Sequence, residues 1–118
     1  MTDSHHEHED ILGKQLVLGT GFTEEDRHEI LERLTPVGKR LRSYPGDSVE
    51  LRLSIKNRGE ETQRLTLECV LPGVEPLVAN SERPDLSSAL TEVREDMIHE
   101  LERVKTRRDP RHDRPHRP

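Results

Sequence analysis

Two clusters of basic side chains are the residues whose types and spacing best fit a chemical role. The first cluster is Lys39, Arg40 and Arg42, and the second is Arg107 and Arg108. Lysine and arginine neutralise phosphates and release counterions, which gives salt-dependent binding without sequence readout. Because neighbouring like charges repel one another unless an anion lies against them, we expect both clusters to contact RNA.

Other basic residues have a plainer interpretation as members of solvated ion pairs. For Arg94 and Arg103, pairing with nearby carboxylates on a solvated helix face is the alternative to RNA contact. For Arg94 we prefer that alternative. Arg52 and Lys56 are expected on an exposed strand face, and either interpretation stays open. With one tyrosine, one phenylalanine and no tryptophan, the sequence predicts no aromatic platform for stacking RNA bases.

The sequence shows no set of residues suited to catalysis, and we expect no enzyme activity and no cofactor. Cys69 is flanked by leucines two positions away on either side, so we expect a small core residue rather than a nucleophile. The acidic N-terminal segment contains His5, His6 and His8. Such segments can bind metals but more often do not, and we expect no metal site.

Charge and composition divide the chain into alternating segments. Of its 118 residues, 29% are hydrophobic and 36% are charged, and the net charge is −5. Residues 36–64 and 103–118 are basic, whereas 1–35 and 65–102 are acidic. We expect one domain over 14–108, with disordered segments over 1–13 and 109–118. The single cysteine and the absence of a long apolar run or signal-like leader favour a cytoplasmic protein without a membrane partner.

Helix and strand patterns alternate in the order that a two-layer domain requires. A strand is expected over 14–18. Thr23 begins a helix with a capping-box pattern, and its apolar residues continue in one phase past Pro36. Proline either kinks such a helix or begins a second one, and the unbroken phase favours a kink. Ile30, Leu34, Val37 and Leu41 form that apolar face.

Three further strands and a long helix follow. Strict alternation over 48–56 and 62–71 predicts strands with one buried and one wet face, and a weaker strand is expected over 76–80. Asp85 begins a helix that ends near Arg107, with one apolar stripe. The fold class is therefore α+β, with the order β-α-β-β-β-α. It is a two-layer sandwich in which two helices cover one face of a four-stranded sheet. The first two strands should pair in parallel.

The chain resembles the short-form ribosome hibernation promoting factors, also known as the ribosome-associated inhibitor or sigma-54-modulation-like family. The resemblance covers about residues 14–108, and its fragments follow in the family's order. These fragments are VELRLSIK at 49–56, RLTL at 64–67, LPG at 71–73, PLVAN at 76–80, DLSSAL at 85–90 and LERVK at 101–105.

The resemblance implies binding to the small ribosomal subunit and its rRNA, in the channel for messenger and transfer RNA. It also implies inhibition of translation under stress or in stationary phase. Arg103 and Lys105 match basic positions near the end of the family's final helix. We expect a monomer off the ribosome and no small-molecule substrate. The alternative is a protein-interaction module on the same fold, whose acidic final helix meets a basic partner.

Overall fold

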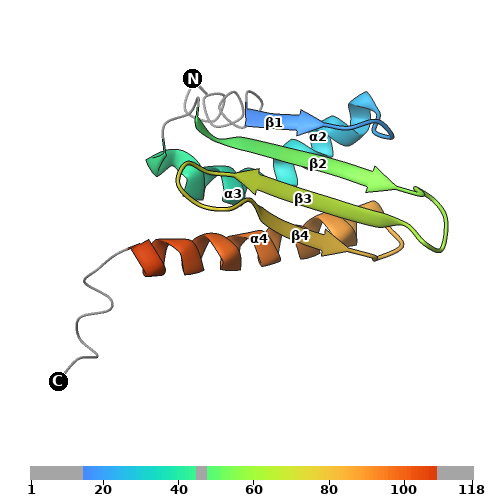
Figure 1. Ribbon diagram of the computed structural model, residues 1–118. Coiled ribbons are helices and arrows are strands. Elements are labelled where there is room, and N and C mark those ends of the chain that lie inside the picture. The colour runs from blue at the N-terminus through green and yellow to red at the C-terminus, as the bar shows by residue number, and fades with distance from the viewer. Residues whose placement is uncertain (1–14, 45–47, 109–118) are drawn as a thin grey trace.

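A four-stranded sheet covered on one face by helices forms the structure, a computed structural model (Figure 1). It describes residues 15–44 and 48–108, except for the side chains of Arg107 and Arg108. The segments 1–13 and 109–118, for which disorder is expected, lie outside the described residues. The elements are β1 (Leu16–Leu18), α2 (Glu24–Arg33), α3 (Thr35–Arg40), a 3₁₀ turn η1 (Leu41–Ser43), β2 (Glu50–Lys56), β3 (Arg64–Val70), β4 (Leu77–Ser81) and α4 (Leu86–Arg108). The predicted α+β class is confirmed.

The sheet has the order β1-β2-β3-β4. β1 pairs with β2 in parallel, with Val17 beside Arg52, whereas β2–β3 and β3–β4 are antiparallel. The parallel pair predicted from the helical crossover is therefore present. Because the register places Leu53 beside Leu67 and Leu67 beside Ala79, the apolar positions of three strands share one face.

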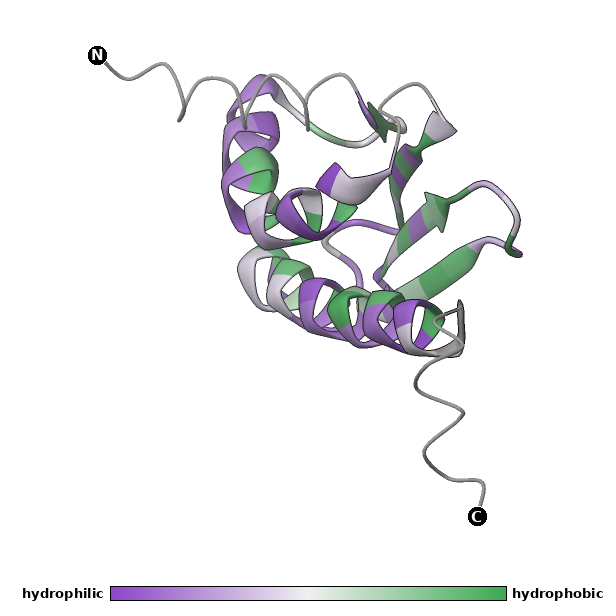
Figure 2. Cartoon of the chain, turned by 90° about the vertical axis from the view of Figure 1, so that its left-hand side faces the viewer, coloured by the Kyte–Doolittle hydropathy of each residue, from purple (hydrophilic) through white to green (hydrophobic). Residues whose placement is uncertain are grey.

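That face and the helices enclose the core. The alternation predicted for the two central strands is observed, because the inward apolar positions are buried, Ile55 partly so, and their neighbours are exposed or partly exposed. Figure 2 shows the helices and the sheet with alternating hydrophilic and hydrophobic positions along their ribbons. The opposite face of the sheet is open and mostly polar, with Val17 and Val78 as its exposed large hydrophobic residues. The fully buried large side chains are Ile30, Leu34, Val37, Leu41, Leu51, Leu53, Leu65, Leu67, Leu90, Val93 and Met97.

The first helical region differs from the expected kinked helix. α2 ends at Arg33, and a separate helix α3 begins at Thr35, with Pro36 in its first turn. The preference for a kink was wrong, and the structure instead has the second helix that the same proline permits. The buried apolar face nevertheless continues from α2 into α3, because Leu34, at the junction, is itself fully buried. Three helices, rather than two, therefore cover the sheet.

Hydrogen bonds fix where the long helix α4 begins. The Asp85 carboxylate accepts from the Ser88 backbone N–H at 2.9 Å, as an N-cap should. Just before it, the buried Gln63 side chain donates to the carbonyl oxygens of Arg83 and Pro84. These contacts anchor the start of α4 to the end of the β2–β3 hairpin. In the described part of the chain, no helix has the length and apolar character needed to cross a membrane.

Candidate nucleic-acid interface

A groove between the α3–η1 segment and the last turns of α4 brings the first basic cluster beside Lys105. We call it the basic groove. It has a volume of about 450 Å³. Three residues from the first cluster and one from α4 supply its positive charge. The lining residues are Lys39, Arg40, Arg42, Ser43, Tyr44, Leu101, Glu102 and Lys105.

Helix packing explains why these basic side chains reach the groove. Val37 and Leu41 are buried, and α3 packs against α4. Lys39 and Arg40 lie between these two buried positions and are exposed. On α4, Leu101 is buried, and Lys105 follows four residues later on the same side of the helix. The apolar contacts that join the two helices therefore place their basic residues at one rim.

The basic groove has a surplus of positive charge. Arg40 pairs with Glu102 across the two helices, with 3.2 Å between Nη2 and Oε2. Both side chains are about half exposed, so this ion pair contributes little to stability. Lys39 and Lys105 are exposed, and neither has an ion pair within the described residues. These two lysines are the cations best placed to accept a phosphate.

Among the other basic candidates, Arg103 has a described side chain, and it does not line the groove. Arg103 donates to Glu100 on its own helix at 3.1 Å, and its side chain is 63% exposed. It lies two positions beyond Leu101, and successive helical residues point about 100° apart, so it faces away. Arg107 and Arg108 belong to the last turn of α4. Their side chains lie outside the described part of the chain, and their role stays a prediction.

Two apolar residues of the groove were not selected from the sequence. Leu101 is buried at 5% exposure, and Tyr44 is half-buried against the hydrophobic core. Both lie among exposed cations, so the groove has a basic rim and an apolar floor. A lone tyrosine followed in the sequence by proline and glycine does not by itself indicate a binding site. Only the proximity of η1 to α4 gives Tyr44 a place in the site.

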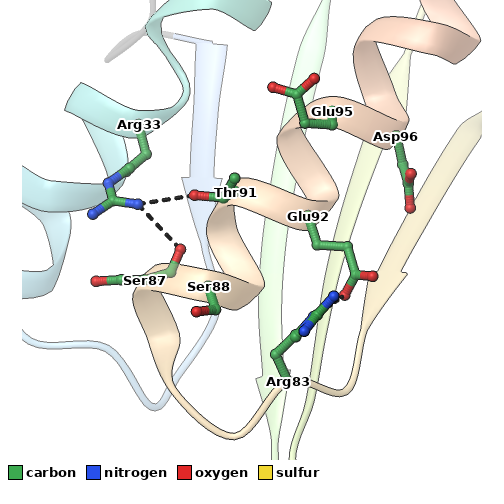
Figure 3. A pocket seen from close by; sticks show the side chains of 8 residues that line it. All are labelled: Arg33, Arg83, Ser87, Ser88, Thr91, Glu92, Glu95 and Asp96. Carbon is green, nitrogen blue, oxygen red and sulfur yellow. Dashed lines mark hydrogen bonds and ion pairs between the residues drawn. The ribbon is translucent and has the colours of Figure 1, made fainter.

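A second hollow lies at the opposite end of α4 and is acidic. Figure 3 shows Glu92, Glu95 and Asp96 on this helix, with Arg83 beside Glu92. The hollow has a volume of about 570 Å³. Glu92 accepts from the Ser81 hydroxyl at 2.6 Å and lies 3.4 Å from the Arg83 guanidinium. These contacts hold its pKa below the usual range.

Arg33 joins α2 to this acidic end rather than offering a free cation. Its guanidinium donates to the Ser87 carbonyl at 3.2 Å and to the Thr91 hydroxyl at 2.9 Å (Figure 3). It also lies 3.6 Å from Glu29, which accepts from the Ser87 hydroxyl. Both arginines of this hollow are paired, whereas Glu95 and Asp96 are exposed, so the hollow should repel a polyanion. The N-terminal half of α4 is therefore acidic, whereas its C-terminal half contributes Lys105 to the basic groove.

The remaining predicted features behave as ordinary structure. Cys69 is fully buried, and burial raises the pKa of its thiol to about 12, as expected of a small core residue. Arg94 pairs with its neighbour Glu95 at 2.9 Å, which is the interpretation preferred from the sequence. Among the residues described, no group of three or more His, Cys, Asp or Glu side chains could hold a metal ion.

Comparisons of the sequence with protein-family models and with curated proteins found no match.

Proposed function

We propose that this protein binds the RNA of the small ribosomal subunit and inhibits translation under stress or in stationary phase. The observation that carries the RNA-binding part is the placement of Lys105 in one groove with Lys39, Arg40 and Arg42, which lie far from it in the sequence. The ribosomal target rests on the family resemblance of residues 14–108. The proposal requires no chemistry of the protein's own.

The electrostatics of the groove support this proposal. A phosphate backbone is a line of charges, and a groove with cations on both sides contacts it at several points. Lys39 and Arg40 stand on one side and Lys105 on the other. Backbone contacts of this kind position a protein without reading bases. Occupying the channel for messenger and transfer RNA would then block translation by exclusion.

Sedimentation with purified small subunits at rising salt tests the proposal. We expect the full chain to pellet with the subunits at low salt and to be released as salt rises. Lys39→Gln combined with Lys105→Gln should be released at lower salt. The slope of log K against log salt is negative, and each lost phosphate contact makes it shallower by about 0.7–0.9. The slope of the double variant should therefore be shallower than that of the wild type by roughly 1.5.

A matched control is Lys56→Gln combined with Arg64→Gln. These residues are cross-strand partners on β2 and β3, are exposed, and lie on the open face of the sheet. The control changes the net charge by the same amount as the Lys39→Gln, Lys105→Gln variant. If the groove binds the RNA, the control should keep nearly the wild-type slope of log K against log salt. Equal losses in the two variants would contradict a contact at the groove. A wild-type chain that stays in the supernatant even at low salt would contradict ribosome binding.

One observation favours a second candidate, the protein-interaction module. The acidic hollow exposes Glu95 and Asp96, which suits a basic protein surface better than RNA. Under this candidate, neutralising Glu95 and Asp96 would reduce partner binding. The same change would leave subunit sedimentation unchanged or improved, so one pair of assays separates the two functions.

A further inference from the structure

We propose that the basic groove binds an unpaired RNA nucleotide, whose base stacks on the ring of Tyr44 while its phosphates contact Lys39 and Lys105. This inference rests on the proposed RNA binding and specifies which form of RNA the groove accepts. It also changes the expectation that the chain has no aromatic surface for a base.

Tyr44 is held firmly enough to serve as a stacking surface. Its backbone N–H donates to the Leu41 carbonyl at 3.0 Å, which closes the 3₁₀ turn. Its side chain packs against the core cluster and also lines the groove. Packing against the core limits the motion of the ring, and the part of it that lines the groove is available to a ligand. A preordered ring loses little entropy on binding.

The shape and charge of the groove fit one nucleotide. Pockets of about 300–1,000 Å³ hold small ligands, and this one has about 450 Å³. Its floor of Tyr44 and Leu101 is apolar, whereas its rim carries the cations. A base offers an apolar face to such a floor, and its phosphates reach the rim.

A duplex would use this groove poorly. Its bases are stacked on one another inside the helix, so only phosphates and sugars would meet the protein. The lysines would contact phosphates of the duplex, but the ring of Tyr44 would have no base to contact. The groove should therefore prefer single-stranded segments and loops, where bases can be turned outward.

Binding of three probes to the full chain tests the proposal. The probes are a non-pairing RNA of about eight nucleotides of mixed sequence, an RNA duplex of matched length, and inorganic polyphosphate. Tyr44→Leu keeps an apolar side chain but removes the ring. We expect it to weaken binding of the single strand by about 5- to 100-fold, with little change for the other two probes. Tyr44→Phe should bind like the wild type.

The wild-type chain offers a second readout that needs no variant. It contains one tyrosine and no tryptophan, so emission excited in the tyrosine absorption band, where phenylalanine hardly absorbs, comes from Tyr44. After correction for light absorbed by the RNA, the single strand should quench this emission and polyphosphate should not.

The outcomes separate the two levels of the proposal. If Tyr44→Leu leaves single-strand binding intact, or weakens all three probes equally, stacking is wrong while RNA binding stands. If polyphosphate quenches Tyr44 as strongly as RNA does, stacking is likewise wrong. If the wild-type chain binds none of the probes at low salt, the RNA-binding function itself fails.

Discussion

Asp26 joins two parts of the fold through a single carboxylate. It accepts from the Thr23 backbone N–H at 2.8 Å, which closes the capping box of α2. It also pairs with Arg58, from the turn between β2 and β3, at 2.5 and 3.1 Å. Arg58 in turn donates to the Gly21 carbonyl at 2.8 Å. Asp26 therefore links the start of the first helix to a hairpin that follows thirty residues later.

The Arg58 hydrogen bond is the main reason that the pKa of Asp26 falls from 3.8 to about 2. Asp26→Asn should lower the free energy of unfolding by about 1–2 kcal/mol near neutral pH. Above about pH 4 the carboxylate is ionised in both states, and its contribution is complete. As the pH falls toward 2, the unfolded chain takes up the proton first, so that contribution is lost. Urea unfolding across this range measures the effect.

The matched control is Glu25→Gln, which removes an exposed acid from the same first turn of α2. It should cost only a few tenths of a kcal/mol, about the size of a helix-dipole contribution. The difference between wild type and Asp26→Asn should shrink as the pH falls from about 4 to 2. A difference that is the same at both ends of this range would contradict the assignment of the low pKa to Asp26.

At the scale of elements, the turn from β1 into α2 depends on Gly21. Its φ of 101° lies in the left-handed region, which glycine adopts without steric cost. A Cβ at this position would lie 2.9 Å from Cγ2 of Ile55 on the neighbouring strand. Ile55 is β-branched and cannot easily turn away. The tight crossover therefore requires glycine for two separate reasons.

Gly21→Ala and Gly59→Ala together separate these reasons. Gly59 also has a positive φ, of 85°, but a Cβ there meets nothing within 4 Å. We expect Gly59→Ala to cost about 1 kcal/mol from backbone strain alone. Gly21→Ala should cost roughly 1–3 kcal/mol more because of the clash. Alanine reduces the conformational entropy of the unfolded chain by a similar amount in both variants, so this effect cancels when their free energies of unfolding are compared. Equal losses in thermal or urea unfolding would show that Ile55 accommodates the new methyl group.

At the scale of the whole molecule, the ends of α4 have opposite electrostatic character. Its N-terminal half contributes Glu92, Glu95 and Asp96 to the acidic hollow, whereas its C-terminal half contributes Lys105 to the basic groove. The net charge of −5 should slow the approach of RNA in most orientations. For the proposed RNA binding, this charge asymmetry favours approach at the basic groove.

Glu102 is the acid that most reduces the positive charge of the groove, because it pairs with Arg40. Glu102→Gln should free Arg40 for a phosphate and raise RNA affinity about 2- to 10-fold at low salt. The slope of log K against log salt should steepen by up to about 0.9. Sedimentation with small subunits at several salt concentrations measures both effects. Stability should change by less than about 1 kcal/mol, since the pair is exposed.

Glu95→Gln is the control for this gain. Glu95 is an exposed acid on the same helix, and it likewise pairs with an arginine, Arg94, at 2.9 Å. It lies in the acidic hollow rather than the groove. Equal gains from the two variants would mean that overall charge, not the groove, governs affinity.

Periodicity was sufficient to predict the order of elements and the faces they bury. Alternation over β2 and β3 and the apolar stripe of α4 depend on local geometry, which repeats every two residues in a strand and every 3.6 in a helix. The parallel pairing of β1 with β2 followed from the crossover between them. The break at Leu34 was harder to predict, because a kink and two helices keep the apolar residues in the same phase.

The candidate site was only partly predictable, because it is formed by tertiary contact. The sequence identified Lys39, Arg40 and Arg42 as one cluster of charge, and the resemblance added Lys105. These residues share one groove because α3 packs against α4. Arg103 faces away from the groove because of its position around the helix axis, and it bonds to Glu100 instead. The same packing placed Tyr44 in the groove. Local patterns thus determined the elements, whereas contact between residues sixty positions apart determined the site.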